Sequence, residues 1–243
     1  MNKESFNELH GIWRIIPSMV LTEIISQSKF DFQILDCEHG SYDFQTLEQD
    51  IRICQNQKCL AYVRVGGLNK IEVQRCLDLG ADGIVFPQLN KFEDFKVATK
   101  LIQYPPYGVR GFNPFVVAGG YGYGNIHEKK IDCIAIIETI QAFDELDEIL
   151  NLNELDVIYI GVYDLSAQLN CIGAMDSPKL LSVIDEIIEK CNKASKRVSL
   201  MVKNVQEYKV FKEKGVSSFV HTIDSYQLKT AFINILENLK FKS

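Results

Sequence analysis

The sequence predicts one (β/α)8 barrel, and both its length and the pattern of its apolar residues favour this fold class. A chain of 243 residues suits a single barrel of this kind. Short apolar runs alternate along the chain with amphipathic stretches of helical period. Runs such as IAIIE and DVIYIG are apolar on both faces, which is typical of parallel strands buried on both sides. Strict alternation of such strands with helices favours a closed barrel.

Eight strands and eight helices are predicted from this alternation. The expected strands are residues 11–16, 32–35, 60–65, 83–86, 131–137, 157–160, 197–202 and 218–221. The expected helices are residues 19–27, 44–54, 70–79, 92–102, 142–150, 178–194, 205–214 and 226–239. Gly80 after the third helix and Pro87 after the fourth strand are residues at which such elements commonly end.

A doubly wound open sheet is the alternative, but its usual glycine-rich phosphate turn does not follow the first strand. The sequence shows no linker or low-complexity segment, so residues 1–243 are predicted to form one domain. Residues 104–130 are the exception, because this stretch is rich in Gly, Pro and aromatic residues and too long for a simple connection. Loops of this length are usually functional, and the many aromatic residues argue against a disordered insertion.

Composition narrows the class of protein. A net charge of −6 and a pI of about 5.3 argue against a nucleic-acid partner. The apolar runs are too short to span a membrane, and the N-terminus lacks the apolar core of a signal peptide. The seven cysteines form no CxxC pair and are expected to be free thiols in a cytoplasmic protein.

Barrel enzymes carry functional side chains at the carboxyl ends of their strands, and this rule selects a short set of polar residues. They are Asp36, Glu38 and His39 after the second strand, Arg64 at the end of the third, Glu138 after the fifth and Asp164 after the sixth.

Glu138 and Asp164 suit a hard divalent cation. Mg²⁺ or Mn²⁺ is often held by one or two carboxylates, with water and substrate oxygens completing the shell. A 2-oxo acid can chelate such a metal, which stabilises the enolate formed when the neighbouring carbon–carbon bond breaks. The alternative is that Asp164 caps a helix and that Glu138 serves the N-terminus of the helix after it.

His39 and Arg64 are the other chemical candidates. His39 is a candidate general base, with Asp36 or Glu38 fixing its tautomer, although a histidine in a polar loop is often only a surface residue. Arg64 is a candidate anion clamp or enolate stabiliser. Its alternative is a structural salt bridge with Asp36, Glu38 or Asp78.

Two further residues are expected near the substrate. Arg110, followed by Gly111, would bring a cation and backbone amides to a substrate carboxylate, the alternative being a role in loop architecture. Trp13 is expected either to form a wall of the pocket or to belong to the core.

Several stretches resemble the HpcH/HpaI aldolase family of class II pyruvate-type aldolases, which is related to the citrate lyase β subunit. They are FDFQILDCEHG, YVRVGG, CLDLGADGIVFPQL, YPPYGVRG, IAIIET and DVIYIGVYDLS, and they occur in the family's order over residues 9–235. The resemblance implies a barrel whose last helix is swapped between neighbours in a hexamer or trimer of dimers. It also implies a carbon–carbon lyase acting on a 2-oxo acid and an aldehyde.

The resemblance also implies roles for individual residues. Glu138 and Asp164 would bind the metal, Mg²⁺ or Mn²⁺, with Co²⁺ as a further option. His39, paired with Asp36, would act as acid and base, and Arg64 would bind the keto oxygen. Two further roles complete the implied site: Asp78 would support Arg64 or a subunit interface, and the backbone of Gly161, Val162 and Tyr163 would bind the substrate carboxylate.

The chain departs from the family pattern at the expected pocket. Ile136 replaces a glutamine that many members carry two residues before the metal-binding glutamate. Tyr163 adds bulk beside the expected carboxylate site, and residues 112–115 and 119–124 are expected to form a specificity lid. Three alternatives to the aldolase therefore stay open: an oxaloacetate decarboxylase, a Claisen-type acyl lyase, and a barrel that binds a metabolite without turnover.

Overall fold

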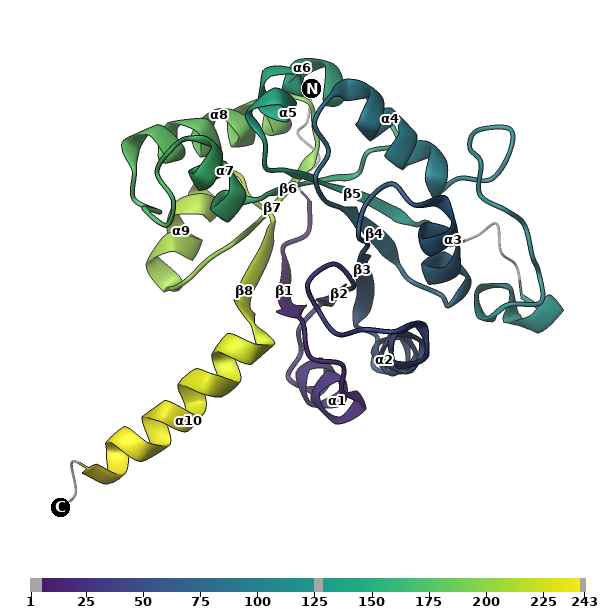
Figure 1. Cartoon of the computed structure of the whole chain (residues 1–243), viewed down its shortest axis with the longest axis horizontal. Helices are drawn as coiled ribbons and strands as arrows, with labels where there is room; N and C mark the ends of the chain where they lie inside the picture. The colour runs from purple at the N-terminus through teal and green to yellow at the C-terminus, as the bar shows by residue number, and fades with distance from the viewer. Residues whose placement is uncertain (1–5, 125–128, 241–243) are drawn as a thin grey trace.

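Eight parallel strands close into a barrel in the computed structural model, which describes residues 6–124 and 129–240 (Figure 1). The strands are β1 (Leu9–Arg14), β2 (Phe32–Asp36), β3 (Leu60–Arg64), β4 (Gly83–Phe86), β5 (Asp132–Ile137), β6 (Val157–Ile160), β7 (Arg197–Met201) and β8 (Ser218–Ile223). Each strand pairs with the next, and β8 pairs with β1 to close the ring. The predicted barrel is therefore confirmed, although β1 begins and ends two residues before its predicted bounds.

Ten α-helices and one short 3-10 helix follow or connect the strands in the described part of the chain. The α-helices are α1 (Met19–Gln27), α2 (Phe44–Asn56), α3 (Lys70–Asp78), α4 (Phe92–Leu101), α5 (Ile140–Asp144), α6 (Leu146–Ile149), α7 (Val162–Gln168), α8 (Pro178–Lys193), α9 (Val205–Glu213) and α10 (Asp224–Lys240). None of the helices described here is long and apolar enough to cross a membrane.

Two of these helices differ from the sequence prediction. The single helix expected at 142–150 is split, because Glu145 leaves helical geometry (φ −94°, ψ 9°) between α5 and α6. Helix α7 was not predicted at all. It has only seven residues and follows β6 after Gly161, so it is too short for a periodic pattern to stand out.

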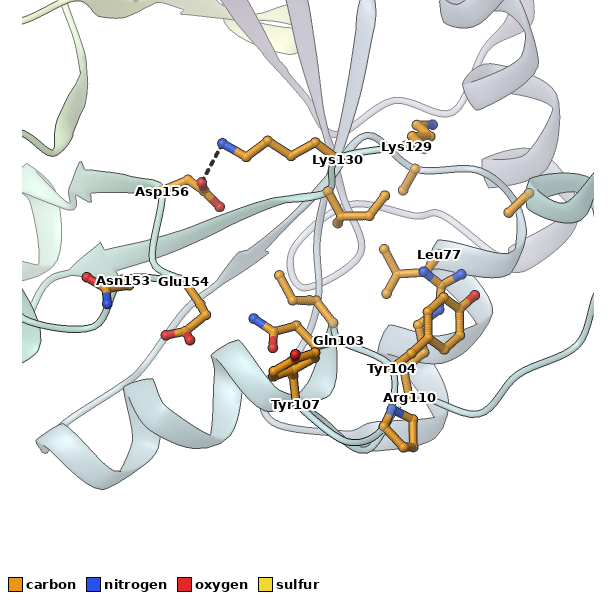
Figure 2. Close-up of a pocket in the computed structure, with 15 residues that line it drawn as sticks. Leu77, Gln103, Tyr104, Tyr107, Arg110, Lys129, Lys130, Asn153, Glu154 and Asp156 are labelled. Carbon is orange, nitrogen blue, oxygen red and sulfur yellow. Dashed lines mark ion pairs between the residues drawn. The ribbon is translucent and has the colours of Figure 1, made fainter. Parts of the chain in front are cut away.

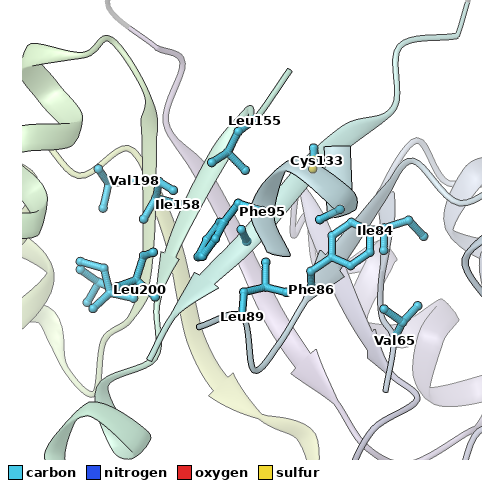
Figure 3. Packing of buried hydrophobic residues seen from close by; sticks show 14 of the residues in the cluster. Val65, Ile84, Phe86, Leu89, Phe95, Cys133, Leu155, Ile158, Val198 and Leu200 are labelled. Atoms are coloured by element: carbon cyan, nitrogen blue, oxygen red, sulfur yellow. The ribbon is translucent and has the colours of Figure 1, made fainter. Parts of the chain in front are cut away.

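The apolar strand residues are divided between two cores. In β5, Ile134 and Ile136 belong to the cluster that fills the barrel, whereas Cys133, Ala135 and Ile137 pack with the helices outside it. Figure 3 shows part of the outer core, to which both Phe86 of β4 and Phe95 of α4 belong. This division explains why the strands are apolar on both faces.

Helix α10 extends away from the barrel instead of packing along it (Figure 1). Its first residue is fixed in the body: Asp224 accepts hydrogen bonds from Arg14 Nε (3.0 Å) and from the backbone N–H groups of Ile15 and Ile16. Beyond this point the helix exposes large apolar side chains, among them Phe232 and Leu236. The expected swap of this helix between neighbouring chains stays a prediction.

Candidate active site

A cavity of about 200 Å³ lies at the carboxyl end of the barrel, and it brings together four of the predicted charged or titratable residues. His39, Arg64, Glu138 and Asp164 all line it, although they come from four different strand-end segments. The strand-end rule therefore selected residues that share one space in the folded chain.

Asp36 and Arg64 form a buried pair beside this cavity. Arg64 donates to the two Asp36 oxygens through Nε (2.9 Å) and Nη2 (2.5 Å), and its guanidinium carbon lies 4.7 Å from the centre of the Trp13 ring. Trp13 also donates from Nε1 to Asp36 (2.9 Å). Burial by itself would raise the pKa of Asp36, but the Arg64 hydrogen bonds and charge outweigh it, and the net shift is downward. Trp13 thus lines the cavity and also holds Asp36.

His39 does not pair with Asp36 in the way that the resemblance implied. Both Asp36 oxygens are used by Arg64 and Trp13, and Asp36 reaches His39 only by accepting its backbone N–H (3.1 Å). The carboxylate beside the ring is Glu38, whose Oε2 lies 4.0 Å from His39 Nε2. The His39 side chain is 71% exposed, so water can reach the imidazole from the open side of the cavity.

Glu138 is buried and is held by Gln88, a residue that the sequence reasoning missed. The Gln88 backbone N–H donates to Glu138 Oε1 (2.5 Å), and its side-chain amide donates to Glu38 Oε1 (2.6 Å). Burial raises the pKa of Glu138, and the charges of Asp164 and Glu38 add to the rise. Glu38 in turn pairs with Arg64 Nη1 at 2.8 Å. Gln88 directly follows the Pro87 that closes β4, so its strand-end position was a signal available in the sequence.

The helix-capping alternatives for the two acids do not hold. Thr139, not Glu138, accepts the backbone N–H of Ala142 and caps α5. Gly161 occupies the N-cap of α7, which places Asp164 in the first turn of that helix. A side chain at Gly161 would meet Glu138, because an added Cβ would lie 2.7 Å from the Glu138 Cβ. Both carboxylates are therefore available to the cavity.

The donor set fits a divalent cation that keeps water or substrate oxygens in its shell. Two carboxylates that repel each other lie in one cavity, and a cation would offset this repulsion. No group of three or more His, Cys, Asp or Glu side chains suited to a metal occurs in the described ranges. Glu138 and Asp164 would supply two ligands of an octahedral shell, in which Mg²⁺ commonly keeps waters at the other positions.

The rest of the cavity lining is mainly apolar, and we call it the apolar wall. It is formed by Trp13 of β1, Ile136 of β5, Tyr159 of β6, Met201 of β7 and Ile223 of β8. Val162 and the half-exposed ring of Tyr163 border the same space. Met201 and Ile223 were not predicted, because the strand-end rule was applied only to polar residues.

Asp78 and Arg110 do not line the cavity at the carboxyl end of the barrel. They pair with each other (Nη2 to Oδ1, 3.3 Å), and Arg110 lines a different cavity together with Ile131 and Asp156, which directly precede β5 and β6 (Figure 2). Helix α3 runs against the strand direction, so Asp78 at its end reaches the amino end of the barrel. The expected contacts of Asp78 with Arg64 and of Arg110 with the substrate site are therefore absent from this chain.

The expected lid is not over the cavity either. Residues 104–124 run along the outside of the barrel: Tyr121 accepts from Arg52 Nη2 of α2 (2.6 Å), and Gln74 of α3 accepts the Gly111 N–H (3.2 Å). None of these residues lines the cavity at the mouth. Residues 125–128 of the same stretch lie outside the described residues.

Comparison with known proteins agrees with this geometry. The model of the family described as HpcH/HpaI aldolase/citrate lyase matches residues 10–229. A 2-dehydro-3,6-dideoxy-6-sulfogluconate aldolase of Pseudomonas putida is 30% identical over 74% of this chain and 72% of its own length. A pyruvate aldolase of Rhizobium etli is 29% identical over 73% of this chain and 72% of its own length. Among solved structures, the citrate synthase SbnG is 27% identical with a TM-score of 0.88, covering 97% of this chain and 94% of that one.

Proposed function

The chain belongs to the HpcH/HpaI aldolase/citrate lyase family, and on this premise we propose that it is a divalent-metal-dependent aldolase. It makes or breaks a carbon–carbon bond next to pyruvate or a related 2-oxo acid, with an aldehyde as the second partner. The observation that carries the proposal is that Glu138, Asp164, Arg64 and His39 line one cavity. Relatives named as pyruvate-type aldolases support the same reaction class.

In the cleavage direction, the substrate is a 4-hydroxy-2-oxo acid and the bond between C3 and C4 breaks. A base takes the hydroxyl proton, the C4–O bond becomes the carbonyl of the aldehyde, and the C3–C4 electron pair moves into the enolate of the 2-oxo acid. Protonation at C3 then gives pyruvate or its analogue. The protein must therefore bind the developing enolate oxygen and move one proton at each end of the reaction.

Arg64 and His39 supply these two functions in our proposal. The Arg64 guanidinium is fixed by Asp36 and Glu38, so it presents a preorganised positive charge to the keto oxygen. The His39 ring faces the open side of the cavity and exchanges the hydroxyl proton directly or through water. Mg²⁺ or Mn²⁺ (or Co²⁺), held by Glu138 and Asp164, would polarise the 2-oxo acid. The backbone of Gly161, Val162 and Tyr163 stays our prediction for the carboxylate.

The proposal is tested by two linked assays. Deuterium exchange of the pyruvate methyl protons reports enolate formation without any aldehyde, and a panel of aldehydes reports bond formation. We expect both activities with Mg²⁺, Mn²⁺ or Co²⁺ and neither after chelation. His39→Ala should abolish aldol turnover while metal binding persists, whereas the exposed Gln45→Ala on α2 should behave as the parent chain. Full activity of His39→Ala would contradict the role given to the imidazole.

A Claisen-type reaction is the second candidate, because a matched structure is that of a citrate synthase. It would use the same enolate-stabilising groups with an acyl thioester as acceptor. Incubation with oxaloacetate and an acyl-CoA separates it from the aldolase, and pyruvate release from oxaloacetate alone would reveal a decarboxylase. Tight pyruvate binding with no exchange and no product would instead indicate a barrel that only binds a metabolite.

We also propose that copies of this chain assemble through α10, as a hexamer or trimer of dimers. The projecting helix exposes Phe232, Ile235, Leu236 and Leu239, an apolar surface that is costly to leave in water. Light scattering after size exclusion should show an oligomer for the parent chain. Leu236→Glu should reduce its mass, whereas Asn238→Glu on the same helix should not. Nucleic acid and membranes are not among the partners proposed, and a cytoplasmic location stays a prediction.

A further inference from the structure

The mouth of the barrel has one charged wall and one apolar wall, and this asymmetry bears on the choice of aldehyde. We propose that the acceptor is a short, uncharged aliphatic aldehyde and that aldehydes with a carboxylate of their own are rejected. The inference rests on the proposed aldolase function and adds to it the chemical class of the second substrate. The apolar wall is formed mainly by Trp13, Tyr159, Met201 and Ile223.

The 2-oxo acid occupies the charged side of the cavity. Glu138, Asp164 and Arg64 all lie there, and they are the groups to which its keto oxygen and the metal are assigned. The carbon that leaves as the aldehyde must then project towards another part of the cavity. In the closed ring of eight strands, β7 and β8 lie across from β3 and β4, so Met201 and Ile223 are placed across from the end of β3 that carries Arg64. The substituent of the aldehyde is therefore placed against apolar side chains.

The size of the cavity favours a short substituent. Its volume is about 200 Å³. Pyruvate, with its six non-hydrogen atoms, takes a large share of this space. The room that is left inside the cavity suits a chain of a few carbon atoms and not a long acyl group.

The charges available in the cavity exclude an acidic substituent. Among the lining residues of the described chain, Arg64 is the only lysine or arginine, and it is assigned to the keto oxygen of the 2-oxo acid. Lys203, which follows β7 closely, lines cavities beside α9 instead of this one. A carboxylate placed against Met201 and Ile223 would lose its water without gaining a partner, which is strongly unfavourable.

The selectivity can be measured with two aldehydes of equal chain length. Butanal and succinic semialdehyde both have four carbon atoms. Butanal ends in a methyl group, whereas succinic semialdehyde ends in a carboxylate. With pyruvate as donor, we expect kcat/KM to favour butanal by about 10-fold or more, the scale on which a pocket discriminates an ill-fitting group. Met201→Arg would supply the missing cation, and it should shift the ratio towards succinic semialdehyde by about 10-fold or more.

Matched controls keep the test decisive. Val97→Arg places the same new charge on the half-exposed surface of α4, far from the mouth, and should leave the ratio unchanged. Ile223→Lys is the second variant should Met201→Arg not fold, and it is expected to shift the ratio in the same direction. A parent chain that prefers succinic semialdehyde, or folded variants that leave the ratio unchanged, would overturn the inference.

Deuterium exchange of the pyruvate methyl protons distinguishes a wrong assignment of the aldehyde from a wrong assignment of the aldolase function. If the parent chain exchanges the methyl protons but prefers the acidic aldehyde, only the assignment of the acceptor is wrong. If it neither exchanges them nor forms product with either aldehyde, the aldolase proposal itself is contradicted, and the acceptor assignment falls with it.

Discussion

The two walls of the cavity are built in different ways. The charged wall is one connected network, in which Trp13 and Arg64 bind Asp36, Arg64 pairs with Glu38, and Gln88 links Glu38 to Glu138. The apolar wall consists of side chains such as Met201 and Ile223 that pack without polar contacts of their own. A change in the first wall therefore disturbs several groups at once, whereas a change in the second alters shape locally. We infer that the first wall sets the chemistry and the second sets the choice of substrate.

The largest loss of activity is expected at Glu138, which belongs to the hydrogen-bond network of the charged wall and is also a proposed metal ligand. Glu138→Gln keeps the shape of the side chain but removes one of two anionic ligands. We expect kcat/KM to fall by about 1,000-fold or more, because a catalytic metal contributes several kcal/mol and each ~1.4 kcal/mol is tenfold. Calorimetric titration should show weaker binding of Mn²⁺. Glu189→Gln, on the exposed side of α8, is the control, and equal cation affinity in both variants would place the metal elsewhere.

Asp36→Asn is expected to have the next largest effect, and it acts on stability. It removes one of the two carboxylates that pair with Arg64 and leaves Glu38 as the other, so the free energy of unfolding should fall by about 2 kcal/mol at neutral pH. The folded chain holds the pKa of Asp36 below its ordinary value of 3.8, so the carboxylate stabilises the fold above that pH. This contribution is lost as the pH falls from 3.8 through the folded-state pKa.

The gap between Asp36→Asn and the parent chain should therefore narrow with acid in denaturant titrations between neutral pH and pH 3. A gap that stays constant over this range would show that the charge of Asp36 is not what matters.

Gln88 offers a smaller but more selective test. Its backbone lies in the left-handed region (φ 56°), which glycine adopts without strain. Gln88→Gly should keep the N–H bond to Glu138 and the stability, but lose the amide bond to Glu38, lowering kcat/KM by about 10-fold. Gln88→Ala keeps the Cβ that the parent glutamine already carries at this φ, so it should show the same loss of kcat/KM with parent-like stability. A parent-like Gln88→Gly would show that the link to Glu38 is not required.

Trp13 belongs to both walls, and its replacement is expected to have the smallest effect. Trp13→Phe keeps an aromatic surface beneath Arg64 and loses only the Nε1 donor to Asp36. Asp36 retains its other donors, so we expect a loss of about 1 kcal/mol, or roughly fivefold in kcat/KM. Aldehyde preference should not change. A changed preference without a change in rate would mean that the ring acts through the apolar wall alone.

The barrel could be predicted because strands buried on both faces leave a strong apolar pattern in the sequence. The strand-end rule also found His39, Arg64, Glu138 and Asp164, since it depends only on direction within a parallel barrel. It could not predict which carboxylate lies beside the His39 ring, because Arg64 and Trp13 donate hydrogen bonds to both oxygens of Asp36.

The residues whose predicted positions were wrong also depend on contacts between segments that are distant in the sequence. Asp78 ends a helix that runs against the strands, so it lies at the other end of the barrel from the site. Loop residues 104–124 pack against α2 and α3 through contacts that no local pattern reveals. The apolar wall was missed because an apolar strand end does not differ in sequence from ordinary core.

The missing side chain at Gly161 has a consequence for how this site can evolve or be redesigned. β5 and β6 are paired up to the ends from which the two acids emerge, and an added methyl group at position 161 would press on the Glu138 Cβ and on Ile136. Even alanine there would push one acid away from the other. Glycine at position 161 therefore allows Glu138 and Asp164 to stay close together while β5 and β6 remain paired. Variants that redesign the apolar wall should keep this glycine.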